Sequence, residues 1–244
     1  MLSASSAHAQ LPERFARAPL TEVALAQVGA PAAFERYGLT GAGSALCLVD
    51  TGVDPTAIPA ARWVWDARGA ARGHPLEATF GGAVLDPESV ALARDENGHG
   101  TAMASIAVGE AGLAPAAALI VAAAYDAGLG GFPDPDVVTG IRFCRAVAAL
   151  DDAIDETRMV VLLSLGGHDG RHDGRGAFER AIVDAAGDLP VVVAAGNDGE
   201  RAVHAAGRLF DGESASVEVR VPRSSLEDAS IGLTLRLDAR TEGA

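Results

Sequence analysis

Polar residues that could do chemistry follow three apolar runs of this 244-residue chain. Asp50 ends the first run, Ser164 follows the second, and Asn197 follows the third. A fourth cluster, Asn97-Gly98-His99-Gly100-Thr101, contains a His, which a turn rarely needs for its geometry. Because a His titrates near neutral pH, proton transfer is the chemistry that this cluster suggests.

The elements that must position these residues are predicted to be alternating strands and helices. The expected strands are Ala45–Val49, Ala117–Ala123, Met159–Leu163 and Pro190–Ala194. The expected helices are Pro31–Arg36, Thr101–Val108, Asp134–Leu150 with Asp134 as N-cap, and Phe178–Ala186. The strands are continuously apolar, which is typical of a parallel sheet covered on both faces. Sites in such sheets form at the carboxyl ends of the strands, so Asp50, Ser164 and Asn197 are expected near one rim.

Three segments are predicted along the chain. Residues 1–27 form an N-terminal segment, and residues 28–199 form an α/β domain with a doubly wound parallel sheet and helices on both faces. Residues 55–95 within that domain are rich in Gly, Pro and Arg and are expected to be irregular. Residues 200–244 are expected to be an incomplete β-rich insertion, because Ser216–Val221 and Ile231–Leu237 alternate in polarity.

Four motifs together resemble those of the subtilisin-like serine proteases. They are Val49-Asp50-Thr51-Gly52-Val53-Asp54, Asn97-Gly98-His99-Gly100-Thr101, Ser164-Leu165-Gly166-Gly167 and Ala194-Ala195-Gly196-Asn197-Asp198-Gly199. Each motif alone is weak, because Asp, Asn and Gly are ordinary turn residues. Their joint occurrence, in this order and on the expected elements, is what identifies the family. The resemblance covers about Val28 to Gly199.

The resemblance implies a serine endopeptidase that cleaves extended polypeptides through an Asp-His-Ser triad. His99 would be the general base, Asp50 would fix its tautomer, and Asn197 would donate a hydrogen bond to the oxyanion. Substrate would pair as an added strand with an edge on each side. Those edges would be Ser164, Leu165 and Gly166 on one side and Leu129, Gly130 and Gly131 on the other.

The nucleophile is where this sequence departs from the family pattern. The family's Gly-Thr-Ser motif occurs nowhere in the 244 residues, and Gly212-Glu213-Ser214-Ala215-Ser216 instead leads into an expected strand. Ala102 also replaces the family's second His, which is not a triad member. We expect an inactive fragment whose Ser is encoded further along, and the alternative is a pseudoprotease that only binds extended peptides.

Two other classes of protein were weighed. An aspartic protease would use Asp50-Thr51-Gly52, but it needs two such loops or a symmetric dimer in an all-β fold. A nucleotide-binding domain would need a Gly-rich loop after the first strand, whereas Gly41-Ala42-Gly43 precedes it. The alternation of strands and helices favours the subtilisin-like interpretation over both.

Composition restricts the possible partners. The net charge of −14 speaks against nucleic-acid or anionic-membrane partners, because no positive surface is available to pair with phosphate. No apolar run approaches the length of a membrane span. Residues 3–10 resemble the cleavage end of a secretory signal without its basic and apolar parts, so secretion and chance similarity both stay open. The expected location is extracellular or the cell envelope of a bacterium.

Cysteines and possible metal ligands complete the sequence-based expectations. Cys47 and Cys144 lie in apolar stretches and are expected to be buried free thiols. The segment His168-Asp169-Gly170-Arg171-His172-Asp173 has a spacing that could hold a metal, but a solvated loop is expected. No cofactor is predicted, and a structural calcium ion near Asp54, Asp66 or Asp86 cannot be assigned from spacing.

Overall fold

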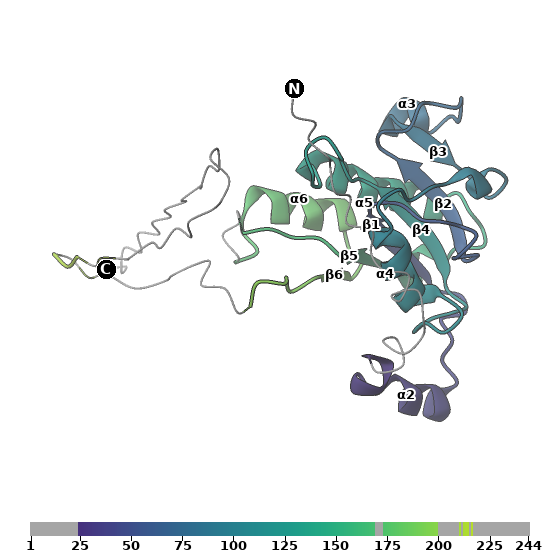
Figure 1. Ribbon diagram of the computed structural model, residues 1–244, viewed down its shortest axis with the longest axis horizontal. Helices are drawn as coiled ribbons and strands as arrows, with labels where there is room; N and C mark the ends of the chain where they lie inside the picture. The colour runs from purple at the N-terminus through teal and green to yellow at the C-terminus, as the bar shows by residue number, and fades with distance from the viewer. Residues whose placement is uncertain (1–23, 169–172, 200–209, 211, 215, 217–244) are drawn as a thin grey trace, which may run out of the picture.

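The computed structural model describes residues 24–168, 173–199, 210, 212–214 and 216, and a six-stranded sheet lies at their centre (Figure 1). The strand order is β3-β2-β4-β1-β5-β6, and all neighbouring strands are parallel except β2 and β3. The strands are β1 (Ala45–Asp50), β2 (Ala61–Asp66), β3 (Ala83–Leu85), β4 (Ala118–Ala123), β5 (Met159–Leu163) and β6 (Val191–Val193). The predicted α/β fold class is confirmed.

Helices cover both faces of this sheet. The helices are α2 (Ala30–Tyr37), α3 (Glu77–Phe80), α4 (His99–Val108), α5 (Asp134–Ala148) and α6 (Ala177–Ala186), with short 3-10 turns at Val90–Leu92 and Glu156–Arg158. Of these, α4 packs on one face of the sheet and α5 and α6 pack on the other, whereas no residue of α2 belongs to either core. Side chains alternate along β1, so Leu48 packs in the core beneath α4, whereas Val49 packs in the core beneath α5 and α6. The apolar runs of the sequence are therefore buried on both sides, as a central parallel strand requires.

The expectation of irregular structure over residues 55–95 is wrong, since β2, α3 and β3 lie within this stretch. In β2, Trp63, Val64 and Trp65 are buried, while Arg62 interrupts the apolar pattern that would have revealed a strand. The Arg62 guanidinium is held by Asp151, which accepts hydrogen bonds from its Nε atom at 2.5 Å and from an Nη atom at 2.9 Å. A partner 89 positions away thus compensates for the charge in the strand.

The helix over residues 134–148 begins one residue earlier than expected. Asp134 is the first helical residue and Pro133 is the N-cap, with no side-chain cap hydrogen bond. Asp134 and Asp136 still place negative charge in the first turn of α5, where the helix dipole favours it. The other helices and strands predicted between residues 28 and 199 are found within two residues of their expected ends.

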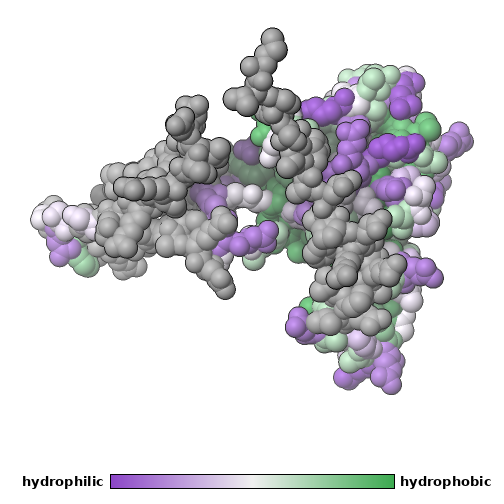
Figure 2. All heavy atoms as spheres, viewed as in Figure 1, coloured by the Kyte–Doolittle hydropathy of each residue, from purple (hydrophilic) through white to green (hydrophobic). Residues whose placement is uncertain are grey.

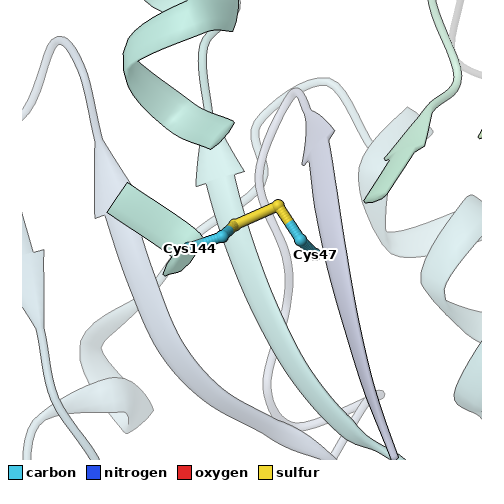
Figure 3. Close-up of a disulfide and its surroundings, with 2 residues drawn as sticks. All are labelled: Cys47 and Cys144. Atoms are coloured by element: carbon cyan, nitrogen blue, oxygen red, sulfur yellow. A yellow bond between two sulfur atoms is a disulfide. The ribbon is translucent and has the colours of Figure 1, made fainter. Parts of the chain in front are cut away.

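Cys47 and Cys144 form a disulfide, which corrects the expectation of two free thiols. The bond joins the middle of β1 to α5 through the buried core, and both residues are fully buried (Figure 3). Their Cα atoms are 5.8 Å apart, within the range that a disulfide spans. Burial in apolar stretches suits a disulfide as well as free thiols, so the sequence alone did not distinguish the two.

The surface is mixed in polarity, and hydrophilic side chains gather over β2, β3 and α3 (Figure 2). Over the described ranges, no helix is long and apolar enough to cross a membrane. The alternating segments expected after Gly199 lie outside the described residues, apart from Ser216, as do residues 3–10.

Candidate active site

The carboxyl ends of the parallel strands share one edge of the sheet. Asp50 is in register with Ala123 of β4, and Leu163 of β5 is in register with Val49 of β1 and Val193 of β6. The loops that follow these strands therefore leave the sheet side by side. The sequence predicted candidate site residues in the loops after β1, β4, β5 and β6. All four loops begin at this edge of the sheet.

Asp50 is the last residue of β1, and its side chain is fully buried. Its Oδ1 atom accepts a hydrogen bond from the backbone N–H of Thr51 at 2.7 Å. Its Oδ2 atom is buried without a hydrogen-bond partner among the described residues. Burial raises the pKa of Asp50 above its ordinary value, against the lowering effect of hydrogen bonds from His99 and Thr51.

His99 opens α4, directly after Gly98, whose φ of 87° lies in the left-handed region that favours glycine. The Nδ1 atom of His99 lies 2.7 Å from Oδ1 of Asp50, although 49 positions separate the two residues. The imidazole is 43% exposed, and its Nε2 atom has no hydrogen-bond partner in the described part of the chain. The ring is therefore fixed at one nitrogen and open at the other.

Asp95 is a residue of this site that the sequence interpretation missed. Its carboxylate lies between the loop after β1 and the start of α4, where it accepts hydrogen bonds from the hydroxyls of Thr51 and Thr101. Sequence showed Asp95 only as part of a turn before His99. The signal that could have found it is a Thr directly after Asp50 and another two residues after His99.

The expected substrate edge after β5 is partly buried at its start and exposed further along. Ser164 and Leu165 are half-buried, and Leu165 packs against the core shared with α5 and α6. Gly166 is exposed, and a Cβ atom there would meet nothing within 4 Å. The open backbone at Gly166 leaves room for another chain to approach.

The opposing edge lies in a tight turn between β4 and α5. The backbone groups of Asp126 and Gly131 bond to each other, and the Asp126 side chain also accepts from the N–H groups of Gly128 and Leu129. Gly130 has a φ of 65°, and Leu129 is 75% exposed at the tip. The Arg68 guanidinium donates to the Asp126 carboxylate at 2.9 Å and so anchors this turn to the end of β2.

Asn197 lies in the exposed loop that follows β6. No hydrogen bond joins it to Asp50 or His99 among the residues that the structure describes. Its neighbour Asp198 bonds to Nε2 of His168 at 2.8 Å, which links the loops after β5 and β6. The structure thus joins Asp50 and His99 by a hydrogen bond and places Asn197 in a loop at the same edge, with no hydrogen bond to either among the described residues.

The acidic residues considered for calcium each stabilise a local turn. Asp54 accepts hydrogen bonds from Thr56, Asp66 accepts from Arg68 and Gly69, and Asp86 accepts from Ser89. The described residues contain no cluster of three potential metal ligands. Residues 169–172 of the possible metal-binding loop lie outside them.

Comparison with known proteins agrees with this geometry. A subtilisin-like protease of the fungus Coccidioides posadasii (strain C735) is 39% identical over 129 residues, which cover 52% of this chain and 27% of that protein. The structure of the Clostridium perfringens CspB protease aligns with a TM-score of 0.54 and 25% identity, covering 69% of this chain and 39% of that one. The chain thus spans about a quarter of the curated relative that it matches. The model of the subtilase family matches residues 41–234, and the chain belongs to that family.

Proposed function

We propose that this chain supplies the Asp-His part of the active site of a serine endopeptidase that hydrolyses extended polypeptides by acyl transfer. The observation that supports it best is the 2.7 Å contact between Nδ1 of His99 and Oδ1 of the buried Asp50. This contact leaves Nε2 free on a partly exposed ring, where a hydroxyl group could reach it. Membership of the subtilase family, a protease family, agrees with a peptide substrate.

In the proposed reaction, Nε2 of His99 takes the proton of a Ser hydroxyl as its oxygen attacks the scissile carbonyl carbon. The carbonyl π electrons move to oxygen and form an oxyanion. Imidazolium then gives the proton to the leaving amine as the C–N bond breaks, and water hydrolyses the acyl-enzyme by the same steps. Asp50 holds the ring with its proton on Nδ1 and stabilises the imidazolium through its negative charge. No cofactor takes part.

The loops after β4, β5 and β6 would bind the substrate and its transition state. An extended peptide would pair with Ser164, Leu165 and Gly166 on one side and with Leu129, Gly130 and Gly131 on the other. The side chain of Asn197 would donate to the oxyanion, a contact whose removal costs about 10²–10³ in turnover in this family. Asn197 is exposed in the loop after β6, so its side-chain amide is accessible to a bound substrate.

The 244 residues contain no Gly-Thr-Ser, so in this proposal the rest of the encoded protein supplies the nucleophile. The same observation favours a second candidate function. If the whole protein also lacks this Ser, the loops would bind extended peptides without cleaving them. Loss of the Ser alone costs about 10⁶ in turnover in this family, so binding would then be the only measurable activity.

The test uses the complete protein encoded by the gene, with a fluorophosphonate probe for reactive Ser and a quenched peptide library. We expect labelling and peptide cleavage in the wild type, and neither in His99→Ala. Asp54→Asn is the matched control, because this side chain is exposed and hydrogen-bonds to Thr56 and not to His99. Peptide binding without labelling or cleavage would support the pseudoprotease instead, and neither binding nor cleavage would contradict both functions.

We also propose that the protein works in an oxidising compartment outside the cytosol. The support is the Cys47–Cys144 disulfide, since disulfides persist mainly in secreted and extracytoplasmic proteins. The relatives come from a fungus and a bacterium, so the family itself assigns no organism of origin. Thiol trapping of the protein from its native cells would show a blocked pair if this is right and two reactive thiols if it is wrong.

A further inference from the structure

One carboxylate joins the two loops that carry Asp50 and His99. The Oδ1 atom of Asp95 accepts from the Thr51 hydroxyl at 2.9 Å, and its Oδ2 atom accepts from the Thr101 hydroxyl at 2.7 Å. Backbone N–H groups supply the other bonds: Asn97 and Gly98 donate to Oδ1 at 3.2 and 2.9 Å, and Thr101 donates to Oδ2 at 2.8 Å. Oδ1 thus accepts from both loops, and Oδ2 accepts from the start of α4. We call Thr51, Asp95 and Thr101 the threonine clamp.

The two Thr hydroxyls also accept bonds, and they accept them from the opposite loop. Thr51 Oγ1 accepts from the backbone N–H of Gly100 at 2.8 Å, next to His99. Thr101 Oγ1 accepts from the backbone N–H of Asp54 at 3.0 Å, in the loop after β1. A hydroxyl has a single proton, so donation to Asp95 leaves its lone pairs to receive these amides. The direction of both bonds is therefore set by the charge of Asp95.

Asp95 is well suited to remain ionised. Burial raises its pKa, but hydrogen bonds from Thr101, Gly98 and Thr51 outweigh burial and hold the pKa below its ordinary value. Its negative charge also contributes to raising the pKa of Asp50. The clamp therefore keeps the Asp95 carboxylate near that of Asp50, although their negative charges repel each other. This electrostatic cost is consistent with a role for the clamp.

The two loops that the clamp joins are in close backbone contact. A Cβ atom on Gly100 would lie 2.2 Å from the carbonyl oxygen of Gly52, and one on Gly52 would lie 2.6 Å from the carbonyl oxygen of Arg94. Gly52 also has a φ of 141°, which side-chain-bearing residues rarely adopt. A small displacement of either loop would therefore change the distance between the Asp50 carboxylate and the His99 ring.

We propose that Asp95 is a positioning residue that acts through Thr51 and Thr101 to fix the imidazole of His99 on Oδ1 of Asp50. Held there, neutral His99 carries its proton on Nδ1 and leaves Nε2 unprotonated. The consequence for catalysis rests on the proposed function, because Nε2 must be free to accept a proton from the Ser. The position of the proton on His99 does not depend on that function, and it can be measured without any assay of peptide cleavage.

The experiment is ¹⁵N NMR of the complete protein labelled at His, recorded where His99 is neutral, with His99→Ala to assign its signals. The wild type should show the Nδ1–H tautomer and a low-field proton from the Asp50 hydrogen bond. Thr101→Val removes one clamp hydroxyl at similar volume, and Asp95→Asn replaces an accepting oxygen by a donating NH₂ group. Both should lose the low-field signal and populate the Nε2–H tautomer.

Two conservative variants separate this role from general stability. Thr101→Ser keeps the hydroxyl and should restore the wild-type signals. Asp54→Asn removes one negative charge from the loop after β1 but keeps the backbone N–H that Thr101 accepts, and the Asp54 carboxylate hydrogen-bonds to Thr56 and to no side chain of the clamp. Folded Thr101→Val with wild-type His99 signals would overturn the proposal. If Asp95→Asn does not fold, the Thr101→Val and Thr101→Ser pair decides.

In the complete protein, Thr101→Val should lower kcat by about 10–10²-fold with KM unchanged, and Thr101→Ser should recover it. If no form of the protein cleaves peptides, the proposed function fails while the NMR result still decides the role of the clamp. If peptides are cleaved and Thr101→Val has wild-type kcat and wild-type His99 signals, the clamp has no positioning role and the proposed function stands.

Discussion

The α-carbon of Gly100 lies so close to Gly52 that a Cβ atom added to Gly100 would be 2.2 Å from the Gly52 carbonyl oxygen. This is the point at which the loop after β1 meets the start of α4, one residue beyond His99. The contact is between backbones, so no side-chain rearrangement could relieve it. Both positions must be glycine for the Asp50 and His99 loops to approach as they do.

Gly100→Ala should therefore lower the free energy of unfolding by about 1–3 kcal/mol, because backbone must move to admit the methyl group. Urea unfolding followed by circular dichroism measures the loss. Gly167→Ala is the matched control, since its Cβ would meet nothing within 4 Å, and it should unfold like the wild type. Equal stability of the two variants would contradict the close approach.

Asp50→Asn should become more stable relative to the wild type as pH rises from about 4 to 7. Burial raises the folded-state pKa of Asp50, so ionising this carboxyl lowers the stability of the wild type. This loss of stability is absent below the unfolded-state pKa and complete above the folded-state pKa. The Asn variant has no such cost. Urea unfolding at pH 4, 5.5 and 7 gives the difference.

The control for Asp50→Asn is Asp54→Asn, whose effect should have the opposite sign. Hydrogen bonds from Thr56 lower the pKa of Asp54, so its charge supports the folded state as pH rises. A stability difference between Asp50→Asn and the wild type that stays constant across this pH range would show that burial does not raise the Asp50 pKa.

Asp151→Asn should reduce stability at pH 7 and have little effect near pH 2. Hydrogen bonds from Arg62 lower the pKa of Asp151 to about 2, so its contribution is full above about pH 4 and lost as pH falls toward 2. Because the Arg62 side chain is 37% exposed, we expect an effect on the order of 1 kcal/mol at pH 7. A pH series of urea unfolding curves measures it, and a pH-independent loss would contradict the prediction.

Reduction of the Cys47–Cys144 disulfide should lower the free energy of unfolding by about 3–5 kcal/mol, since the bond closes a loop between residues 97 positions apart. Thermal unfolding with and without a thiol reductant measures the change. The double variant Cys47→Ala/Cys144→Ala should melt at the temperature of the reduced wild type or below, and reductant should not affect it. A wild type insensitive to reductant, although its thiols become reactive, would contradict the prediction.

Most of the sheet could be predicted from sequence because β1, β4, β5 and β6 are short apolar runs between turn residues. β2 could not, since Arg62 breaks its pattern and the compensating carboxylate of Asp151 is distant in sequence. The disulfide could not either, because Cys47 and Cys144 have the same surroundings whether bonded or free. In both cases, the missed strand β2 and the missed disulfide, the partner residue lies far away in the sequence.

The site was predictable where its residue types are unusual and not where they are ordinary. The resemblance of the motifs around Asp50 and His99 to a known family implied a pair, and the structure brings them into contact. Asp95 resembled any turn residue, and its bond to Thr51 spans 44 positions. The roles of Asn197 and of the loops after β4 and β5 stay predictions, since they depend on a bound substrate.

The disulfide also has a topological consequence. The chain from Cys47 to Cys144 is a closed covalent ring, and both Asp50 and His99 lie within it. A single cut anywhere inside the ring, for example in the exposed loop around Gly73, would leave the acid and the base on one connected molecule. A chain nicked at such a place would thus keep Asp50 and His99 tethered, as long as its surroundings remain oxidising.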